Sequence, residues 1–270
     1  MSKSILVFDS GIGGLTILDE IRQVLPDESY LYLFDNARLP YGELDEIDLI
    51  EGCVALIARF VARHDISMVV IACNSASTLV LPSLRTELDI PIVGVVPAIK
   101  PAAALSKKKC IGLLATPGTI KRTYTHELIT RFAAGCKVEL YASSELVLLA
   151  EQKAAGYPVT QRQVAAILSP LMNSELDTLV LGCTHFPILK DEMQLYLGNK
   201  VLLVDSGKAI AARVISIIEQ QAFIAHSSEN DKSHSDEVIS GDAFYTANEI
   251  GEGLKTTLSA FGFTNVVRVE

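Results

Sequence analysis

The sequence contains no apolar run near the roughly 18 residues that a membrane span requires. Its longer runs, ISMVVIAC (66–73) and IPIVGVVPAI (90–99), have the length of buried strands. The N-terminal stretch MSKSILVFDS has no signal-peptide pattern and leads directly into a strand-like segment. We therefore expect a cytoplasmic protein without a membrane partner.

The chain is also short of basic residues, with 23 Lys and Arg against 32 Asp and Glu and a formal net charge of −9. A nucleic-acid partner requires a basic face that attracts the phosphate backbone. The charge balance therefore argues against nucleic-acid binding, although it says nothing about the fold.

The sequence contains few cysteines, and their spacing does not suggest disulfide pairs. The five cysteines are an odd number and are widely spaced: Cys53, Cys73, Cys110, Cys136 and Cys183. With no CxxC pair and no Cys/His cluster, we expect neither a disulfide framework nor a metal site. Cys53, Cys110 and Cys136 are interpreted as small apolar side chains of the core.

What the sequence does contain is the composition of a globular protein, with 49% apolar and 20% charged residues in 270. That length favours two lobes of about 100–150 residues. Strands are predicted over 4–10, 30–36, 66–72 and 91–96, and helices over 14–25, 46–64 and 75–88. Apolar strands that alternate with helices indicate an α/β fold, with a mostly parallel sheet covered on both faces.

The same alternation restarts near residue 110. Strands are predicted over 110–115, 137–142, 178–183 and 200–205, with a helix over about 120–133. We assign 98–206 to a second lobe, and 1–97 plus 207–270 to the first, whose sheet the structured C-terminal part could complete. The polar segment SSENDKSHSDE (227–237) is interpreted as a solvated loop.

The glycine loop FDSGIGGLTIL (8–18) follows the first strand and invites comparison with a dinucleotide site. Gly11 and Gly13 fit the first two positions of G-x-G-x-x-G, and Asp35 ends the next strand, where such sites hold a ribose. The third glycine position is Thr16, however, whose side chain would crowd helix against strand. Two other interpretations therefore remain open.

One of these is a tight glycine turn that binds nothing. The other is a ligand loop in which Asp9 and Ser10 face a substrate that carries an ammonium group. The carboxylate of Asp9 also argues against a dinucleotide, because it would place negative charge near the pyrophosphate. We favour the ligand loop.

Two of the cysteines occupy a distinctive position. Cys73 in VVIACNSAST (69–78) and Cys183 in TLVLGCTHFP (178–187) each follow a predicted strand and precede a helix. Helix N-termini offer unpaired N–H groups and positive potential, which favour a thiolate. Ligands of open parallel sheets bind at the carboxyl ends of the strands, so two closing lobes would bring these cysteines together.

Each of these cysteines has a polar neighbour that could assist it. Asp9 could orient or deprotonate Cys73, and His185 could accept the proton of Cys183, although a histidine in such a turn can also be a structural donor. Neighbouring polar residues could cap the helices or hold a carboxylate. These residues are Asn74, Ser75 and Thr184.

The pairing itself suggests a type of reaction. A cysteine hydrolase needs only one nucleophile, and a thiol redox enzyme usually has its pair close in sequence. Racemisation needs two acid/base groups on opposite faces of one carbon, and thiol and thiolate suit that role because their pKa lies near working pH. The site must also stabilise a carbanion and exclude water.

The ordered motifs resemble those of the cofactor-independent glutamate racemases of the aspartate/glutamate racemase superfamily. The motifs are FDSGIGGLTIL, LPYGE, VVIACNSAST, LLATPGTI and LVLGCTHFPIL, and the likeness covers almost the whole chain. The resemblance implies two pseudo-symmetric α/β lobes with the active site between them. It also implies interconversion of L- and D-glutamate without a cofactor or metal, for peptidoglycan synthesis, by a homodimer.

The resemblance further implies roles for individual residues. Cys73 would deprotonate D-glutamate with help from Asp9, and Cys183 would deprotonate L-glutamate with help from His185. The other substrate-binding residues would be Ser10, Tyr41, Gly42, Asn74, Ser75, Thr116, Thr119 and Thr184, with Pro40 and the loosely matched Glu151 completing the set.

Alternatives and departures remain. An aspartate racemase would share the chemistry, but its second motif tends to read Gly-Cys-Thr-Glu, whereas His185 stands here. A non-catalytic amino-acid binding protein would need neither thiol. Ser75 replaces a usual threonine, and the acidic ELDEIDL (43–49) leaves the capping of the next helix open. The N-terminus lacks the extension of family members that depend on a peptidoglycan precursor, so we do not expect that dependence.

Overall fold

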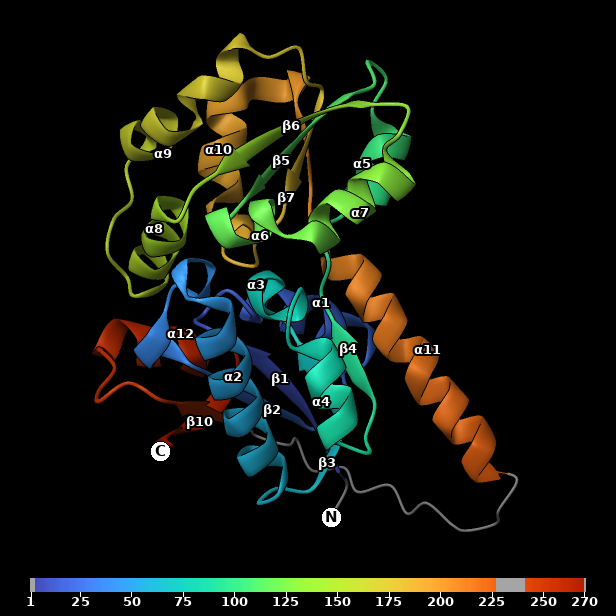
Figure 1. Ribbon diagram of the computed structural model, residues 1–270. Coiled ribbons are helices and arrows are strands. Elements are labelled where there is room, and N and C mark those ends of the chain that lie inside the picture. Colours follow the sequence, from blue (N-terminus) through green and yellow to red (C-terminus); the bar gives the residue numbers. More distant parts are fainter. Residues whose placement is uncertain (1–2, 227–240, 270) are drawn as a thin grey trace.

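The computed structural model describes residues 3–226 and 241–269, so the polar segment 227–237 lies outside the described residues. Figure 1 shows two lobes, one above the other, each built from a sheet with helices around it. The α/β fold with two lobes is therefore confirmed, and every strand pairing in both sheets is parallel.

The first sheet has six strands in the order β10-β9-β2-β1-β3-β4. Their bounds are β1 Ser4–Asp9, β2 Tyr30–Phe34, β3 Ile66–Ile71, β4 Ile92–Gly94, β9 Gly241–Tyr245 and β10 Phe263–Arg268. The two C-terminal strands add to the edge of β2, as expected. The chain therefore leaves the first sheet after β4 and returns to complete it.

The second sheet has four strands in the order β6-β5-β7-β8. Their bounds are β5 Cys110–Ala115, β6 Lys137–Ala142, β7 Thr178–Leu181 and β8 Leu202–Val204. β5 and β7 are fully buried, as expected for central strands, whereas the edge strand β6 is half-exposed.

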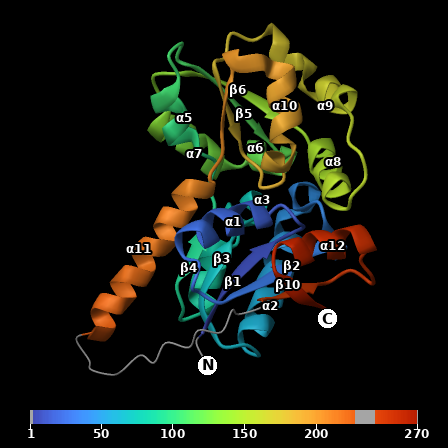
Figure 2. The same cartoon turned by 180° about the vertical axis from the view of Figure 1, so that it is seen from behind.

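Side-chain alternation along β1 explains how both faces of the first sheet become covered. Ile5 and Val7 pack with the apolar residues of α1 (Leu15–Val24) and α11 (Gly207–His226), while Leu6 and Phe8 pack with those of α2 (Glu46–Val61). Figure 2 shows α1 and α11 from behind, on one face of this sheet.

The remaining helices lie around and between the two sheets. They are α3 Asn74–Ser77, α4 Leu81–Glu87, α5 Ile99–Leu105, α6 Pro117–Lys121, α7 Thr123–Phe132, α8 Glu145–Ala154, α9 Gln161–Leu168, α10 Lys190–Leu197 and α12 Glu252–Ala260. Short 3-10 helices are η1 Asn36–Arg38, η2 Tyr41–Glu43, η3 Ser169–Asn173, η4 Phe186–Leu189 and η5 Gly198–Lys200. None of the helices described is both long and apolar enough to cross a membrane.

Two of the predicted helices are wrong as single elements. The helix expected over 75–88 is broken into α3 and α4, because Pro82 lacks an N–H and its ring would clash with the carbonyl four residues earlier. The helix expected over 120–133 is broken at Arg122, whose backbone is extended with φ −72° and ψ 139°. Both breaks lie at the boundary between the lobes, where Arg122 contacts Thr78.

The acidic segment after residue 42 supplies its own helix cap. The Asp45 carboxylate accepts a 2.9 Å hydrogen bond from the N–H of Ile47, at the start of α2. Glu46 and Asp48 then place negative charge in the first helical turn, where the helix dipole favours it. Of the three cysteines assigned to the core, Cys53 and Cys110 are buried and Cys136 is half-buried.

Candidate active site

The two cysteines at the strand ends lie in the region where the lobes meet. Cys73 follows β3 and occupies the N-cap position of α3, while Cys183 follows β7 and precedes η4. Both side chains are buried, at 5% and 7% exposure. A charge on Cys183 is one of the causes that raise the pKa of Cys73, so the two sulfur atoms lie within electrostatic reach of each other.

Cys73 is surrounded by residues from the end of β1. Its Sγ lies 3.8 Å from the hydroxyl oxygen of Ser10. Burial raises the pKa of Cys73 well above its ordinary value, and the negative charge of Asp9 raises it further. The sulfur is therefore held as a protonated thiol, the form that can donate a proton.

Asp9 is the acidic residue whose charge acts most strongly on that thiol. One carboxylate oxygen accepts a 2.6 Å hydrogen bond from the N–H of Ser10, and the other accepts a 3.0 Å bond from the hydroxyl of Thr184. Complete burial raises the pKa of Asp9, although His185 and these donors oppose the change. A carboxylate whose pKa is raised in this way is a better proton acceptor than an exposed aspartate.

Cys183 has a different set of partners. Its Sγ lies 3.8 Å from Nδ1 of His185, and Nε2 of the same ring lies 2.7 Å from a carboxylate oxygen of Glu151. Burial lowers the pKa of His185, but contacts with Cys183 and Glu151 outweigh it and raise the pKa well above 6.5. The ring is therefore held as an imidazolium beside the sulfur of Cys183.

The glycine loop makes room for this histidine and glutamate. A Cβ on Gly13 would lie 2.5 Å from Nδ1 of His185, and one on Gly11 would collide with the Glu151 carboxylate. The same carboxylate accepts a 2.7 Å hydrogen bond from the N–H of Ile12. Glu151 thus places negative charge where a dinucleotide would need its pyrophosphate, which argues against that interpretation of the loop.

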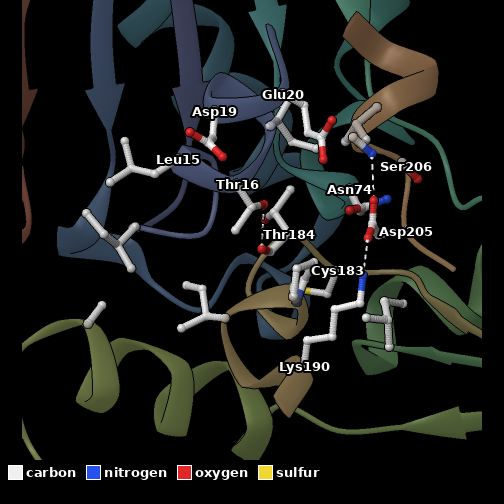
Figure 3. Close-up of a pocket in the computed structure, with 18 of the residues that line it drawn as sticks. Leu15, Thr16, Asp19, Glu20, Asn74, Cys183, Thr184, Lys190, Asp205 and Ser206 are labelled. Atoms are coloured by element: carbon white, nitrogen blue, oxygen red, sulfur yellow. Dashed lines mark hydrogen bonds and ion pairs between the residues drawn. The ribbon is translucent and has the colours of Figure 1, made fainter. Parts of the chain in front are cut away.

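The residue at the third glycine position, Thr16, links the two lobes. Its hydroxyl donates to the carbonyl of Gly13 at 2.8 Å and lies 3.0 Å from the carbonyl of Thr184. Figure 3 shows this contact between Thr16 and Thr184. Thr16, which does not fit the dinucleotide motif, therefore joins the two loops that carry the two halves of the site.

Three hydroxyl groups form a second buried cluster. The Oγ of Ser75 lies 2.9 Å from Oγ1 of Thr116 and 3.3 Å from Oγ1 of Thr119, and the two threonine oxygens are 3.0 Å apart. Gly42 packs directly against Thr116, because a Cβ at Gly42 would collide with that side chain. The cluster joins α3 of the first lobe to α6 of the second and offers hydroxyl donors to a carboxylate.

Asn74 contributes a donor without a partner. Its side-chain Nδ2 is buried and makes no hydrogen bond within the described residues. Asn74 also lines a cavity of about 480 Å³, as do Cys183 and Thr184 (Figure 3). Cys73 and Asp9 are absent from the lining, so this cavity reaches the Cys183 side of the site.

Two predicted substrate residues are placed less directly. The hydroxyl of Tyr41 lies 2.5 Å from the Asp35 carboxylate and accepts from Arg38 at 3.0 Å, so it does not point to the thiols. Pro40 follows a cis peptide bond and precedes η2.

Sequence reasoning missed several residues that shape the site. The buried hydroxyl of Tyr32 donates to the carbonyl of Gly11 at 2.6 Å. The guanidinium of Arg122, from the second lobe, donates to the carbonyl of Ser75 and to the hydroxyl of Thr78. No sequence signal marked Arg122, because its contacts cross between segments 44 or more residues apart.

Taken together, the fold and the site describe a two-lobed α/β protein with two buried thiols at the ends of parallel strands. Each thiol has its own acid or base, and no group of three or more His, Cys, Asp or Glu across 3–226 and 241–269 is arranged to hold a metal ion. The chain belongs to the family described as Asp/Glu/Hydantoin racemase, whose model matches residues 14–214.

Within that family the chain is similar to glutamate racemases. It is 64% identical to the glutamate racemase of Shewanella woodyi over 100% of this chain and 99% of the relative. Among solved structures, Escherichia coli glutamate racemase in complex with L-glutamate and the activator UDP-MurNAc-ala matches with a TM-score of 0.90 and 44% identity, over 100% and 98% of the two chains. A glutamate racemase isoform of Bacillus anthracis matches with a TM-score of 0.81 and 28% identity, over 99% and 97%.

Proposed function

We propose that this protein interconverts L-glutamate and D-glutamate by two-base proton transfer at the α-carbon. The observation that carries the proposal is the pair of buried thiols, Cys73 and Cys183, each beside a different acid or base. The close relationship to glutamate racemases, at 64% and 44% identity, supports glutamate as the substrate.

The protonation states give the reaction a starting point. With L-glutamate bound, the Cys183 thiolate takes the α-proton, and the Cys73 thiol delivers its own proton to the opposite face of the carbon. D-glutamate leaves, Cys183 is then a thiol, and Cys73 is a thiolate. The reverse reaction begins from that state, so the proton count balances in both directions.

The helpers restore and hold these states. The imidazolium of His185, itself held by Glu151, stabilises the Cys183 thiolate. Asp9 lies beside the Cys73 side, and its raised pKa suits it to accept a proton from that thiol. The two halves are thus complementary, because one favours a thiolate and the other favours a thiol.

Stabilisation of the carbanion and recognition of the substrate fall to the donors around the thiols. The hydroxyls of Ser75, Thr116 and Thr119 and the unpartnered amide of Asn74 are available for the two carboxylates of glutamate. Asp9, Ser10 and Thr184 form the polar wall on the other side, where an ammonium group would be neutralised. Burial of the whole set excludes water, which strengthens each of these interactions.

The proposal is tested by incubating the purified protein with L-glutamate, and separately with L-aspartate, in deuterium oxide with nothing else added. We expect optical rotation to decay to zero with L-glutamate while the α-hydrogen signal is replaced by deuterium. Racemisation of aspartate in preference to glutamate would favour the aspartate alternative. Binding of glutamate without exchange would favour a non-catalytic amino-acid binding protein.

The wider setting is proposed on the same basis. We propose that the enzyme acts in the cytoplasm, supplies D-glutamate for peptidoglycan synthesis, works without a cofactor or metal, and forms a homodimer. We also propose a lobe boundary at 97/98 and 206/207, where the chain crosses between the sheets. Depletion of the protein in its host, followed by rescue with D-glutamate, tests the cell-wall role, and sedimentation tests the dimer.

A further inference from the structure

Asp35 is a buried carboxylate that the proposed chemistry does not use. It follows β2 at the carboxyl edge of the first sheet and is 2% exposed. One carboxylate oxygen accepts from the hydroxyl of Thr246 at 2.6 Å, and the other from the hydroxyl of Tyr41 at 2.5 Å and from Nε of Arg38 at 2.6 Å. A buried carboxylate with this many donors holds its partners firmly in place.

Arg38 compensates the charge and completes the network. Its Nη2 donates to the hydroxyl of Tyr41 at 3.0 Å, and its Nη1 donates to the carbonyl of Asp48 at 3.2 Å. The guanidinium packs against α2 at Gly52, where a Cβ would collide with Nη1 of Arg38. The pair Asp35–Arg38 therefore packs within the loop that joins β2 to α2, residues 35–45.

The loop is also tied to the C-terminal end of β9. The N–H groups of Thr246 and Ala247 donate to the side chain of Asn36 at 3.2 and 3.0 Å, and the N–H of Ala37 donates to the hydroxyl of Thr246 at 3.1 Å. These bonds join segments that are about 210 positions apart in the chain. They fix the start of the loop on the completed sheet.

The far end of the same loop reaches the hydroxyl cluster. Tyr41 is followed at once by Gly42, which packs against Thr116, and a Cβ on Gly118 would lie 2.8 Å from the carbonyl of Gly42. Thr116 in turn contacts Ser75 at 2.9 Å. The position of Tyr41 therefore sets the distance between the Gly42 backbone and the donors that we assign to a substrate carboxylate.

We infer that Asp35 is a positioning residue for substrate binding: by holding Tyr41 it fixes the backbone of Gly42 as one wall of the carboxylate site. The inference rests on the proposed function. It also gives Asp35 a role that needs no dinucleotide. Because Gly42 in this wall packs against Thr116 of the hydroxyl cluster, loosening the wall should weaken substrate binding more than proton transfer.

The variants Asp35→Asn and Tyr41→Phe test this role. Asparagine keeps one acceptor for Thr246 but turns an N–H₂ group toward the donors of Tyr41 and Arg38, and phenylalanine removes the hydroxyl while keeping the ring. We expect KM for both enantiomers of glutamate to rise about tenfold in each variant, with kcat within about twofold of wild type. We also expect faster amide hydrogen exchange over residues 36–44.

Asp177→Asn is the matched control. Asp177 accepts from the hydroxyl of Ser106 at 2.6 Å and from the N–H groups of Lys107 and Lys108 at 2.8 Å, at the start of β7 and away from the site. It should lose stability without a change in KM or in exchange over 36–44. A common fall in stability with no separate KM effect would reduce Asp35 to a structural residue and overturn the inference.

The two proposals fail in distinguishable ways. If wild type does not turn over glutamate, the proposed function fails, and hydrogen exchange over 36–44 alone decides the anchoring role. If wild type is active but both variants keep KM within twofold, the positioning role is wrong and the racemase proposal stands. If Asp35→Asn does not fold, Tyr41→Phe decides the outcome by the same KM and exchange measurements.

Discussion

The carboxylate of Glu151 lies 2.7 Å from Nε2 of His185 and 2.7 Å from the N–H of Ile12. One oxygen of an α8 side chain thus joins the histidine that faces Cys183 to the glycine loop of the other lobe. The contact connects the imidazolium of His185 with the packing of one lobe against the other. A single side chain therefore links the histidine of the proposed mechanism to the contact between the lobes.

Replacement of Glu151 by glutamine should expose that link in the pH dependence. The pKa of His185 is raised, so its pairing stabilises the fold fully below about pH 6.5 and loses that contribution as pH rises through the higher value. Glu151→Gln removes a charge that raises this pKa. The alkaline limb of kcat/KM should therefore move to lower pH, as measured in a pH–rate profile.

Glu192→Gln is the control for that shift. Glu192 of α10 forms an ion pair with Lys153 of α8, at 2.7 Å. Among the contacts of the described residues, Glu192 has none with His185. Its pH profile should match that of wild type. If the alkaline limb of Glu151→Gln is unchanged, the charge on His185 does not control catalysis and the prediction is wrong.

Substitution of either thiol should stop racemisation but leave half of the chemistry. In Cys73→Ser and in Cys183→Ser we expect kcat to fall by at least about 100-fold, because a serine hydroxyl is a far weaker acid. Since the equilibrium constant between enantiomers is one, kcat/KM must fall equally in both directions. The asymmetry should appear in solvent exchange measured by proton NMR in deuterium oxide.

In that measurement Cys73→Ser should retain exchange of L-glutamate, and Cys183→Ser exchange of D-glutamate. Cys110→Ala is the control, because Cys110 is buried at the first residue of β5, at the opposite end of that strand from its carboxyl end. It should keep normal chemistry with some loss of stability. Normal racemisation by either serine variant would falsify the two-thiol mechanism.

Gly13→Ala should damage catalysis through crowding alone. The added Cβ would lie 2.5 Å from Nδ1 of His185, so the ring must move away from Cys183. A displacement near 1 Å can cost about 100-fold in rate, and we expect a loss of that order in kcat with the fold retained by circular dichroism. Gly135→Ala is the matched control, since a Cβ there meets no atom of the described residues within 4 Å.

Thr16→Val should weaken the contact between the lobes. Valine keeps the shape but removes the hydroxyl that reaches the carbonyls of Gly13 and Thr184. We expect the free energy of unfolding in urea to fall by about 1 kcal/mol. Thr130→Val, which removes an exposed hydroxyl bonded to the carbonyl of His126 within α7, should change it far less.

Much of the fold follows from local pattern. β5 is predicted over the observed residues 110–115, because this segment has no polar side chain and follows the polar stretch 106–109. The helix expected over 120–133 is wrong as one element because Arg122 leaves α6 to contact Ser75 and Thr78 of the other lobe. A tertiary contact of that kind overrides helical periodicity and leaves no trace in it.

The site shows the same division. Cys73 and Cys183 stand out because each follows an apolar strand, and both lie buried at strand ends. Glu151 was only loosely identified, because its partners, Ile12 and His185, lie 139 and 34 positions away. Tyr41 was assigned to the substrate, yet its hydroxyl contacts Asp35, and no sequence pattern reports where a side chain in a loop points.

The return of the chain to the first sheet has a consequence for folding during synthesis. β9 and the Thr246 contacts to Asn36 and Asp35 are synthesised about 210 positions after those two residues, so the edge of β2 is unpaired when β1 and β2 leave the ribosome. The second lobe can assemble while the first still has an open edge at β2. Until those contacts form, the substrate wall at Gly42 lacks its anchor, so we expect a chain that stops before β9 to bind glutamate more weakly than the full chain.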